Sequence, residues 1–165
     1  MIPVRVAGIA LDPAGQHVIL LKPIDEAPGE VRILPIWIGA QEATSILAAV
    51  EGADTPRPLA HDLMRTLLAQ LDASVGGVAV SRITDGTFYA DITLDTIAGE
   101  RIVDARPSDA IALACRVGAP IRVAEDVLEE AGVLDTVTAS DDDEDEALDE
   151  FKRFLEAVDP DDFRG

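Results

Sequence analysis

The first part of the chain alternates short apolar runs with polar, turn-forming residues, and this pattern predicts three strands and a helix. Val4–Leu11 and Val18–Lys22 flank a segment that contains Pro and Gly, so we expect them to form a hairpin. A third apolar run, Val31–Ile38, predicts a third strand and ends at Gly39. The residues of the next stretch, Gln41–Val50, favour a helix.

The same order of patterns returns in the second half of the chain. Gly77–Thr84 and Thr87–Leu94 flank the dipeptide Asp85-Gly86, which is the strongest hairpin signal in the sequence. Arg101–Val103 predicts a third strand. It precedes a helical run, Asp109–Val117, which a Gly and a Pro bring to an end.

The two halves match at a fixed offset, because Glu42-Ala43 and Asp109-Ala110 stand 67 positions apart. We therefore predict an α+β fold with two duplicated strand-strand-strand-helix units, over residues 2–52 and 75–120. Together they would form a mainly antiparallel sheet or a barrel-like core with flanking helices. The expected result is one domain of residues 1–137.

A further helix is predicted between the two units, over residues 57–72. Its leucines recur every four positions with other apolar residues beside them, which is typical of an amphipathic helix that faces a core. These residues are Leu59, Leu63, Met64, Leu67, Leu68 and Leu71. Residues 121–134 follow the second unit and predict a short strand and one more helix.

Length and composition limit the chain to one sizeable core. Its 165 residues are 48% hydrophobic, which is enough for one domain and too little for two large ones. No stretch reaches the roughly 18–20 apolar residues that span a bilayer, and the start lacks the features of a signal peptide. We therefore expect a soluble, cytoplasmic protein with no membrane partner. The single cysteine, Cys115, lies in an apolar run and is expected to be a core residue.

Acidic residues dominate the charge, above all near the end of the chain. The net charge is −19, and residues 141–165 hold 12 acidic and 3 basic residues. Residues 138–165 predict an acidic linker and a C-terminal amphipathic helix, whose apolar residues are Phe151, Phe154, Leu155 and Val158. This helix would dock on its own domain or on a sister chain, or it would recruit a protein partner. So acidic a surface repels nucleic acid at long range.

Three segments together resemble the bifunctional nuclease domain family, in the order and spacing of that family. They are Leu34–Gly39 with Glu42-Ala43, Arg57-Pro58 with His61-Asp62-Leu63, and Asp104–Ala110. Phe88-Tyr89-Ala90 is also similar, and the resemblance covers residues 2–135. The closing segments Phe151–Leu155 and Asp159–Phe163 are similar to the tails of actinobacterial members. The resemblance implies a bacterial nuclease that acts on both DNA and RNA.

Four carboxylates and one histidine are the candidate catalytic residues. Phosphodiester hydrolysis needs a nucleophile, charge relief at the phosphate and a proton for the leaving oxygen, which carboxylates, divalent metals and a base commonly supply. The carboxylates stand at or just before predicted helix starts, where we expect them to converge and hold Mg²⁺ or Mn²⁺: Glu42, Asp62, Asp104 and Asp109. His61 is the candidate general base or metal ligand. The alternatives are carboxylates that only stabilise a helix's first turn and a His61 that makes a structural hydrogen bond.

Two Arg-Pro pairs precede predicted helices, at Arg57 and Arg106. The free N–H groups at a helix start can bind an anion, so each arginine is a candidate binder of the substrate's phosphate. Alternatively each arginine pairs with a nearby carboxylate: Asp54 or Asp62 for the first, and Asp104 or Asp109 for the second. No phosphate loop, Cys-x-x-Cys, His-Glu-x-x-His or Gly-x-Ser-x-Gly motif is present, so no cofactor beyond Mg²⁺ or Mn²⁺ is expected.

Two functions remain open on the sequence alone. The first is a metal-assisted nuclease that uses the residues above on DNA and RNA. The second is a non-catalytic binding or assembly protein, which the acidic surface, the missing catalytic motif and the apolar tail helix favour. In either case we expect a homodimer, because a small duplicated sheet leaves apolar strand edges exposed.

Overall fold

The structure is a computed structural model that describes residues 1–25 and 31–135. The predicted acidic linker and C-terminal helix, over residues 138–165, lie outside the described residues. None of the helices in the described part of the chain is long and apolar enough to cross a membrane. In chain order the elements are β1 (Ile2–Leu11), β2 (His17–Pro23), β3 (Arg32–Ile38), α1 (Ala40–Glu51), α2 (Ala60–Gln70), β4 (Ser74–Thr84), β5 (Thr87–Thr96), β6 (Gly99–Ala105), α3 (Pro107–Val117), β7 (Ile121–Val123), α4 (Glu125–Ala131) and β8 (Val133–Leu134).

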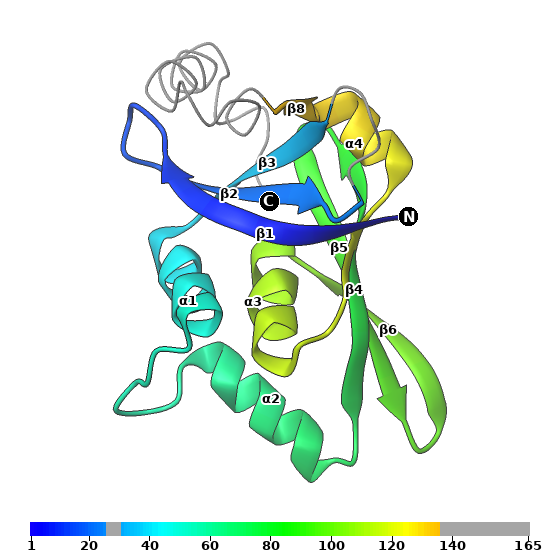
Figure 1. Cartoon of the computed structure of the whole chain (residues 1–165). Coiled ribbons are helices and arrows are strands. Elements are labelled where there is room, and N and C mark those ends of the chain that lie inside the picture. The colour runs from blue at the N-terminus through cyan, green and yellow to red at the C-terminus, as the bar shows by residue number, and fades with distance from the viewer. Residues whose placement is uncertain (26–30, 136–165) are drawn as a thin grey trace.

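Both predicted strand-strand-strand-helix units are present: β1, β2 and β3 lead into α1, and β4, β5 and β6 lead into α3. Within each unit the strands pair antiparallel with their sequence neighbours. β7 lies between the units, antiparallel to β1 and parallel to β4, and the sheet has the order β6-β5-β4-β7-β1-β2-β3-β8 (Figure 1). The α+β fold is therefore confirmed. Over residues 1–25 and 31–135 the sheet is open, with β6 and β8 at its edges, and does not close into a barrel.

Turn residues explain where several elements end. The β4–β5 hairpin turns at Asp85 and Gly86, whose φ angles of 50° and 74° are the positive values that a two-residue turn of this twist requires. α3 ends at Val117, and the left-handed backbone of its C-cap Gly118 (φ 67°) lets the N–H of Ala119 donate to the carbonyl of Ala114. The Asp-Gly pair and the helix-ending glycine therefore act as the sequence predicts.

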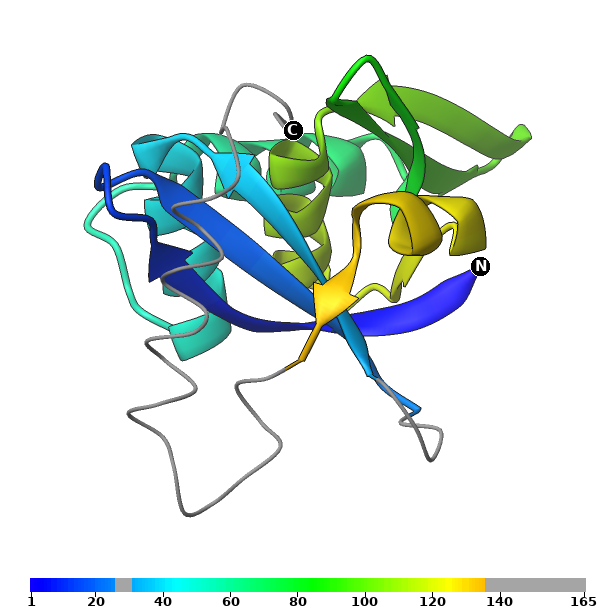
Figure 2. The same ribbon diagram turned by 90° about the horizontal axis from the view of Figure 1, so that it is seen from above.

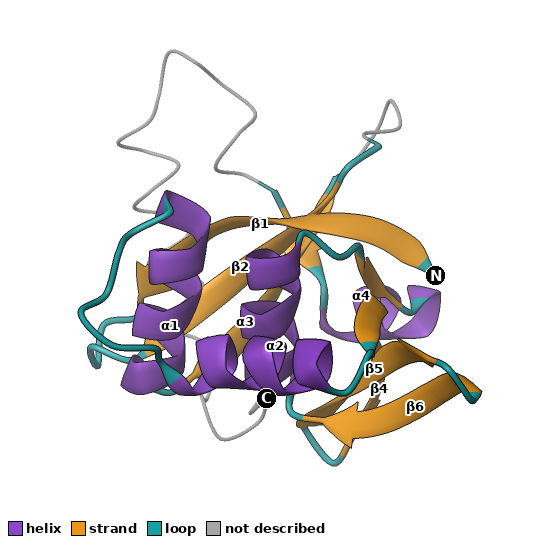
Figure 3. Cartoon of the chain, turned by 90° about the horizontal axis from the view of Figure 1, so that it is seen from below, coloured by secondary structure: helices purple, strands orange, loops and turns teal. Residues whose placement is uncertain are grey.

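The core lies between the sheet and the helices α1 and α3. β3 is buried along nearly its whole length, and Leu34 and Ile36 have no exposed surface. α3 buries Ile111 and several alanines, whose small side chains allow α1 to pack closely beside it. Figures 2 and 3 show α1 and α3 side by side on one side of the strands, with α2 lying across them. This arrangement brings the first turns of the three helices together.

α2 turns a different face inward from the one that its leucines predict. Leu63, Leu67 and Leu71 are 53%, 53% and 72% exposed, whereas His61 is 5% exposed. The predicted burial is therefore wrong for these three leucines, whereas Leu68 of the same stripe is partly buried against the core. The physical reason is that His61 and Asp62 form hydrogen bonds to α1 and α3, which fix the rotation of α2 about its axis. Leu63, Leu67 and Leu71 then face away from the core.

Candidate functional site

The first turns of α1, α2 and α3 line a pocket of about 400 Å³, which we call the helix-junction pocket. α1 contributes Glu42 and Ser45, α2 contributes His61, and α3 with its N-cap contributes Arg106 and Asp109. Glu42 and Asp109 hold equivalent positions in the two duplicated units, and both bind the same arginine. The duplication therefore accounts for the meeting of residues that are far apart in the sequence.

His61 is the centre of a chain of hydrogen bonds. Its Nδ1 lies 2.7 Å from Oγ of Ser45, and its Nε2 lies 2.9 Å from Oδ1 of Asp109. Burial raises the pKa of Asp109, but hydrogen bonds and charges from Arg106 and His61 outweigh this and hold the pKa below its ordinary value. Asp109 is therefore ionised at neutral pH. In the neutral imidazole we assign the proton to Nε2, which donates to Asp109, so Nδ1 accepts from the Ser45 hydroxyl.

Arg106 connects the two duplicated units. It is the N-cap residue of α3, and Pro107 begins that helix with a backbone angle that suits a first turn. Its Nε donates to Asp109 at 2.8 Å and its Nη2 donates to Glu42 at 2.9 Å, and these bonds raise the pKa of Arg106. The side chain is 58% exposed, and its Nη1 has no hydrogen-bond partner among residues 1–25 and 31–135. One edge of the guanidinium therefore remains open to a ligand.

The glycine before α1 makes room for the carboxylate of Glu42. A Cβ atom at Gly39 would collide with Oε2 of Glu42, so the missing side chain lets Glu42 reach Arg106. Gly39 is also the residue that corresponds to Arg106 at the offset of the duplication. One unit therefore supplies the arginine, and the other supplies the space for its second partner.

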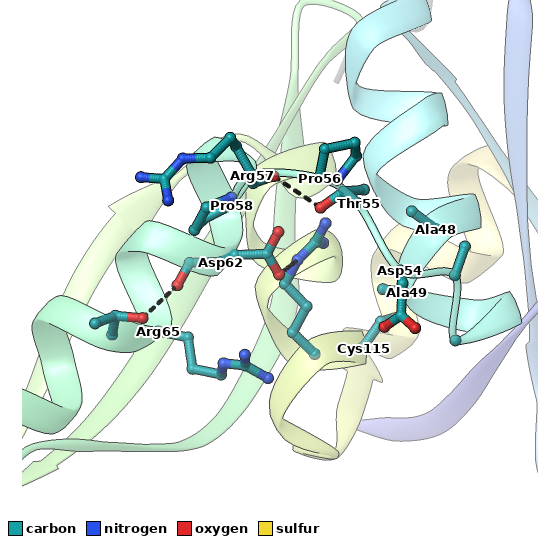
Figure 4. A pocket seen from close by; sticks show the side chains of 14 residues that line it. Ala48, Ala49, Asp54, Thr55, Pro56, Arg57, Pro58, Asp62, Arg65 and Cys115 are labelled. Atoms are coloured by element: carbon teal, nitrogen blue, oxygen red, sulfur yellow. Dashed lines mark hydrogen bonds and ion pairs between the residues drawn. The ribbon is translucent and has the colours of Figure 1, made fainter.

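Asp62 and Arg57 line a second pocket, of about 410 Å³, which we call the arginine pocket (Figure 4). Asp62 accepts the backbone N–H of Leu59 at 2.8 Å and Nε of Arg116 at 2.8 Å. Burial raises the pKa of Asp62, but these two bonds and the charge of Arg116 hold it below its ordinary value. In this geometry Asp62 caps the start of α2 and neutralises a buried arginine. Cys115, predicted to be a core residue, is half-buried and also lines this pocket.

Asp104 lies apart from both pockets. It stands in β6 opposite Asp91, its side chain is 72% exposed, and it is 4.0 Å from Arg82. The predicted convergence of all four carboxylates is therefore wrong for Asp104, because β6 continues to Ala105 and holds it on the strand. The structure brings Glu42, His61, Arg106 and Asp109 together, and it places Asp62 and Arg57 at the arginine pocket.

The described carboxylates do not fit a divalent metal site. Mg²⁺ and Mn²⁺ require several oxygen ligands that converge, whereas Glu42 and Asp109 both bind Arg106, and Asp62 binds Arg116. Within residues 1–25 and 31–135, no three His, Cys, Asp or Glu side chains are grouped so that they could hold a metal ion. Dependence on Mg²⁺ or Mn²⁺ stays a prediction of the sequence, which a cleavage assay with chelator tests.

Two residues of these pockets belong to no motif, although the sequence carries a signal for each. Ser45 stands three positions after Glu42 and therefore lies on the same face of α1. Arg116 is the one charged side chain in an otherwise apolar run after Asp109, where a charge needs a partner. Its partner Asp62 is 54 positions away, so no local pattern reveals the pair.

Comparison with known proteins places the helix-junction pocket inside a described family domain. The model of the bifunctional nuclease domain matches residues 19–136, a range that includes every residue of this pocket. Two proteins from strains of Mycobacterium tuberculosis, each named an uncharacterized protein, are 46% identical over 169 residues, which covers 98% of this chain and 97% of theirs. Bifunctional nuclease 1 of the rice Oryza sativa is 30% identical over 115 residues. That match covers 68% of this chain and 34% of the rice protein.

Proposed function

This chain belongs to the bifunctional nuclease domain family, and we propose that it is a nuclease whose catalytic centre is the helix-junction pocket. The observation that carries the proposal is the chain of hydrogen bonds from Ser45 through His61 to Asp109, over 2.7 and 2.9 Å. In such a chain the histidine takes a proton from the hydroxyl, and the carboxylate orients the ring. Here Nδ1 faces the hydroxyl and Nε2 the carboxylate, the reverse of the serine proteases. Either ring nitrogen can accept a proton.

Ser45 is the proposed nucleophile. As its Oγ attacks the phosphorus, its proton passes to Nδ1 of His61, an Oγ–P bond forms, and the P–O bond to the leaving nucleoside breaks. The leaving oxygen takes the proton from Nδ1, so His61 acts first as a base and then as an acid. Water then attacks the phosphoserine by the same route, which releases the phosphate end of the strand and restores Ser45. Ionised Asp109 stabilises the imidazolium that forms between the two proton transfers.

Arg106 supplies positive charge where the phosphate would bind. Its open guanidinium edge can donate to a phosphate oxygen, and Asp109 and Glu42 orient the group before a substrate arrives. This local charge matters because the net charge of −19 opposes the approach of nucleic acid. Arg106 is therefore the proposed phosphate-binding residue of the catalytic centre.

A nucleophile supplied by the protein can attack the phosphodiester bonds of both DNA and RNA. Cleavage that uses the 2′-hydroxyl of the substrate is open to RNA alone, whereas attack by Ser45 does not need that group. This supports a nuclease for both kinds of strand, as the resemblance of the sequence to the family implies.

Cleavage of fluorescent single-stranded DNA and RNA by the purified full chain tests the proposal. Ser45→Ala and His61→Gln should each reduce the rate at least about 100-fold, the usual size of acid–base and nucleophilic contributions. Asp104→Asn is the matched control, because it removes a carboxylate outside both pockets and should leave the rate unchanged. Equal rates in the wild type and both variants would refute the site. Parallel reactions with magnesium, manganese or chelator measure the metal dependence.

The proposed phosphoserine gives a second test. Acid quenching of a reaction with a labelled strand should leave label on the wild-type protein and none on Ser45→Ala. If the Ser45→Ala variant cleaves at the wild-type rate, Ser45 is not the nucleophile.

The exposed leucines of α2 favour a binding or assembly role as the second candidate function. Leu63, Leu67 and Leu71 are four positions apart and form an apolar strip on the outer face of α2. An apolar strip of this kind can pair with its own copy across a twofold axis. We therefore include in the proposal a cytoplasmic homodimer that uses this strip as its contact surface.

A further inference from the structure

We propose that the arginine pocket binds a second phosphate of the nucleic-acid strand that is cleaved in the helix-junction pocket. The inference rests on the proposed function, because it assigns a second contact to the same substrate. Arg57, Arg65 and Arg116 line the pocket together with Asp54 and Asp62, which gives a net charge of +1. The first 140 positions of this acidic chain hold only ten Lys and Arg residues, and three of them meet here.

Arg116 is a buried cation with a spare donor. Its side chain is 4% exposed, its Nε donates to Asp62, and its Nη1 donates to the carbonyl of Ala112 at 2.9 Å. Its Nη2 has no hydrogen-bond partner among residues 1–25 and 31–135. This nitrogen is not among the fully buried atoms without a partner, so solvent reaches it, and an anion in the pocket could accept its hydrogen bond in place of water.

Arg65 and Arg57 add positive charge that no carboxylate pairs with directly. Neither forms an ion pair within the described ranges. Figure 4 shows Arg65 reaching from α2 toward α3, while Arg57 extends from the loop at the edge of the pocket with its guanidinium directed away from Asp54 and Cys115. Asp62 is bound to Arg116 and also feels the charge of Arg65, and Asp54 is the other carboxylate that lines the pocket. The pocket therefore favours an anion, and a phosphate is the anion that the proposed substrate carries.

The two pockets adjoin the same turn of α2. Leu59, Ala60 and His61 line the helix-junction pocket, whereas Pro58 and Asp62 line the arginine pocket. Each linkage of a nucleic-acid strand carries one negative charge. A strand that crosses this turn could therefore offer one phosphate to Arg106 and another to Arg65. Such a contact would hold the strand in register without reading its bases.

Cys115 gives a direct readout of occupancy, because it is the only cysteine of the chain and it lines the arginine pocket. The rate of its modification by a thiol reagent is measured on the full chain with no addition, with inorganic phosphate, with a mononucleotide, and with short DNA or RNA strands. Alkaline conditions are needed, because burial raises the pKa of Cys115. A methylphosphonate strand, which lacks the charges, is the control for non-ionic contact.

We expect the charged strands to slow modification of Cys115 about tenfold at saturation, and the methylphosphonate strand to have no effect. Arg65→Gln should raise the strand concentration needed for half-protection about tenfold. Arg101→Gln removes an arginine of β6 that forms no ion pair within residues 1–25 and 31–135, and it should leave that concentration unchanged. Protection by free phosphate or a mononucleotide but not by strands would overturn the proposal in favour of a free-anion site. No protection by any of these ligands would overturn it altogether.

The variants also separate this inference from the proposed function. Arg65→Gln should weaken strand binding about tenfold, the loss of one charge-assisted hydrogen bond. It should also lower the salt slope of binding by about 0.7, the loss of one phosphate contact. Arg101→Gln, which lines neither pocket, should leave both the affinity and the cleavage rate unchanged. Strand affinity that is the same in Arg65→Gln and the wild type refutes the second contact. Absence of cleavage in the wild type refutes the proposed function, whatever happens at Cys115.

Discussion

Replacement of Asp62 by alanine tests whether this residue has a structural or a catalytic role. The sequence predicts a catalytic carboxylate, whereas the fold gives Asp62 structural contacts. It accepts the N–H of Leu59 and the Nε of Arg116, both at 2.8 Å. The Arg116 side chain is 4% exposed and that of Asp62 is 24% exposed. The substitution therefore removes a helix-capping bond and leaves a buried arginine without its counter-charge.

The expected loss of stability follows from these two contacts. Breaking a fully buried ion pair by removing one partner costs about 3–5 kcal/mol. We take a cost of about 2 kcal/mol for this pair, below that range. The Asp62 side chain is partly exposed, so water can reach the Arg116 guanidinium once the carboxylate is removed. The lost capping bond adds about 1 kcal/mol. Asp62→Ala should thus lower the free energy of unfolding by about 3 kcal/mol, which in a domain of this size lowers Tm by about 10 °C.

Urea unfolding and thermal melting followed by circular dichroism measure this loss. Asp104→Ala serves as the control, because Asp104 is 72% exposed and 4.0 Å from Arg82, and its removal should change stability by less than about 0.5 kcal/mol. Well below its Tm, Asp62→Ala should cleave nucleic acid at close to the wild-type rate. An unchanged Tm together with lost cleavage would contradict the structural role and return Asp62 to the catalytic centre.

Three further changes test the site and the surface. Gly39→Ala should push the carboxylate of Glu42 away from the arginine at the helix junction and slow cleavage several-fold at unchanged Tm, measured by steady-state kinetics. The folded-state pKa of Asp109 lies below its unfolded value, so its stabilising contribution is complete above about pH 4 and is lost as the pH falls through the folded-state pKa. Asp109→Asn should therefore flatten the acid branch of the stability curve obtained from urea midpoints; an unchanged acid branch would argue against the bonds to its neighbours. Leu63→Glu with Leu67→Glu should convert a dimer to a monomer in light scattering, and a wild-type chain that is monomeric would rule out the contact.

The duplicated fold is accessible from the sequence because local signals mark its parts. Asp85-Gly86 can form only a few kinds of turn, and glycines end α1 and α3 with left-handed backbone. The fixed offset between Glu42 and Asp109 then relates the two units. The two-residue strand β8 has no such signal, because its pairing with β3 depends on the tertiary structure.

The rotation of α2 could not be predicted from its pattern. A leucine stripe usually marks the buried face of a helix, but His61 and Asp62 bind partners on α1 and α3 and take that place. Pairings between distant polar residues override the apolar stripe here, and the sequence does not show them.

Most residues of the candidate site could be predicted from the sequence, but most of the hydrogen bonds between them could not. Arg106 and Asp109 are three positions apart at a helix start, so their pairing is local and follows from the sequence. The bonds of His61 to Ser45 and Asp109 join three helices, and they depend on how these helices pack. The prediction for Asp104 is wrong because a sequence pattern locates the end of a strand only to within a residue or two. β6 continues two residues beyond the predicted strand, so Asp104 lies on a face of the sheet and not at a helix start.

The most direct test of the catalytic centre is histidine-selective NMR of the full chain, titrated with a strand whose scissile linkage is replaced by a non-hydrolysable methylene phosphonate. The chain has two histidines, and His17, at the start of β2, lines neither pocket. We predict that the ring resonances of His61 shift to saturation while those of His17 stay in place. Ring resonances of His61 that do not move at strand concentrations sufficient for cleavage would contradict a catalytic centre in the helix-junction pocket.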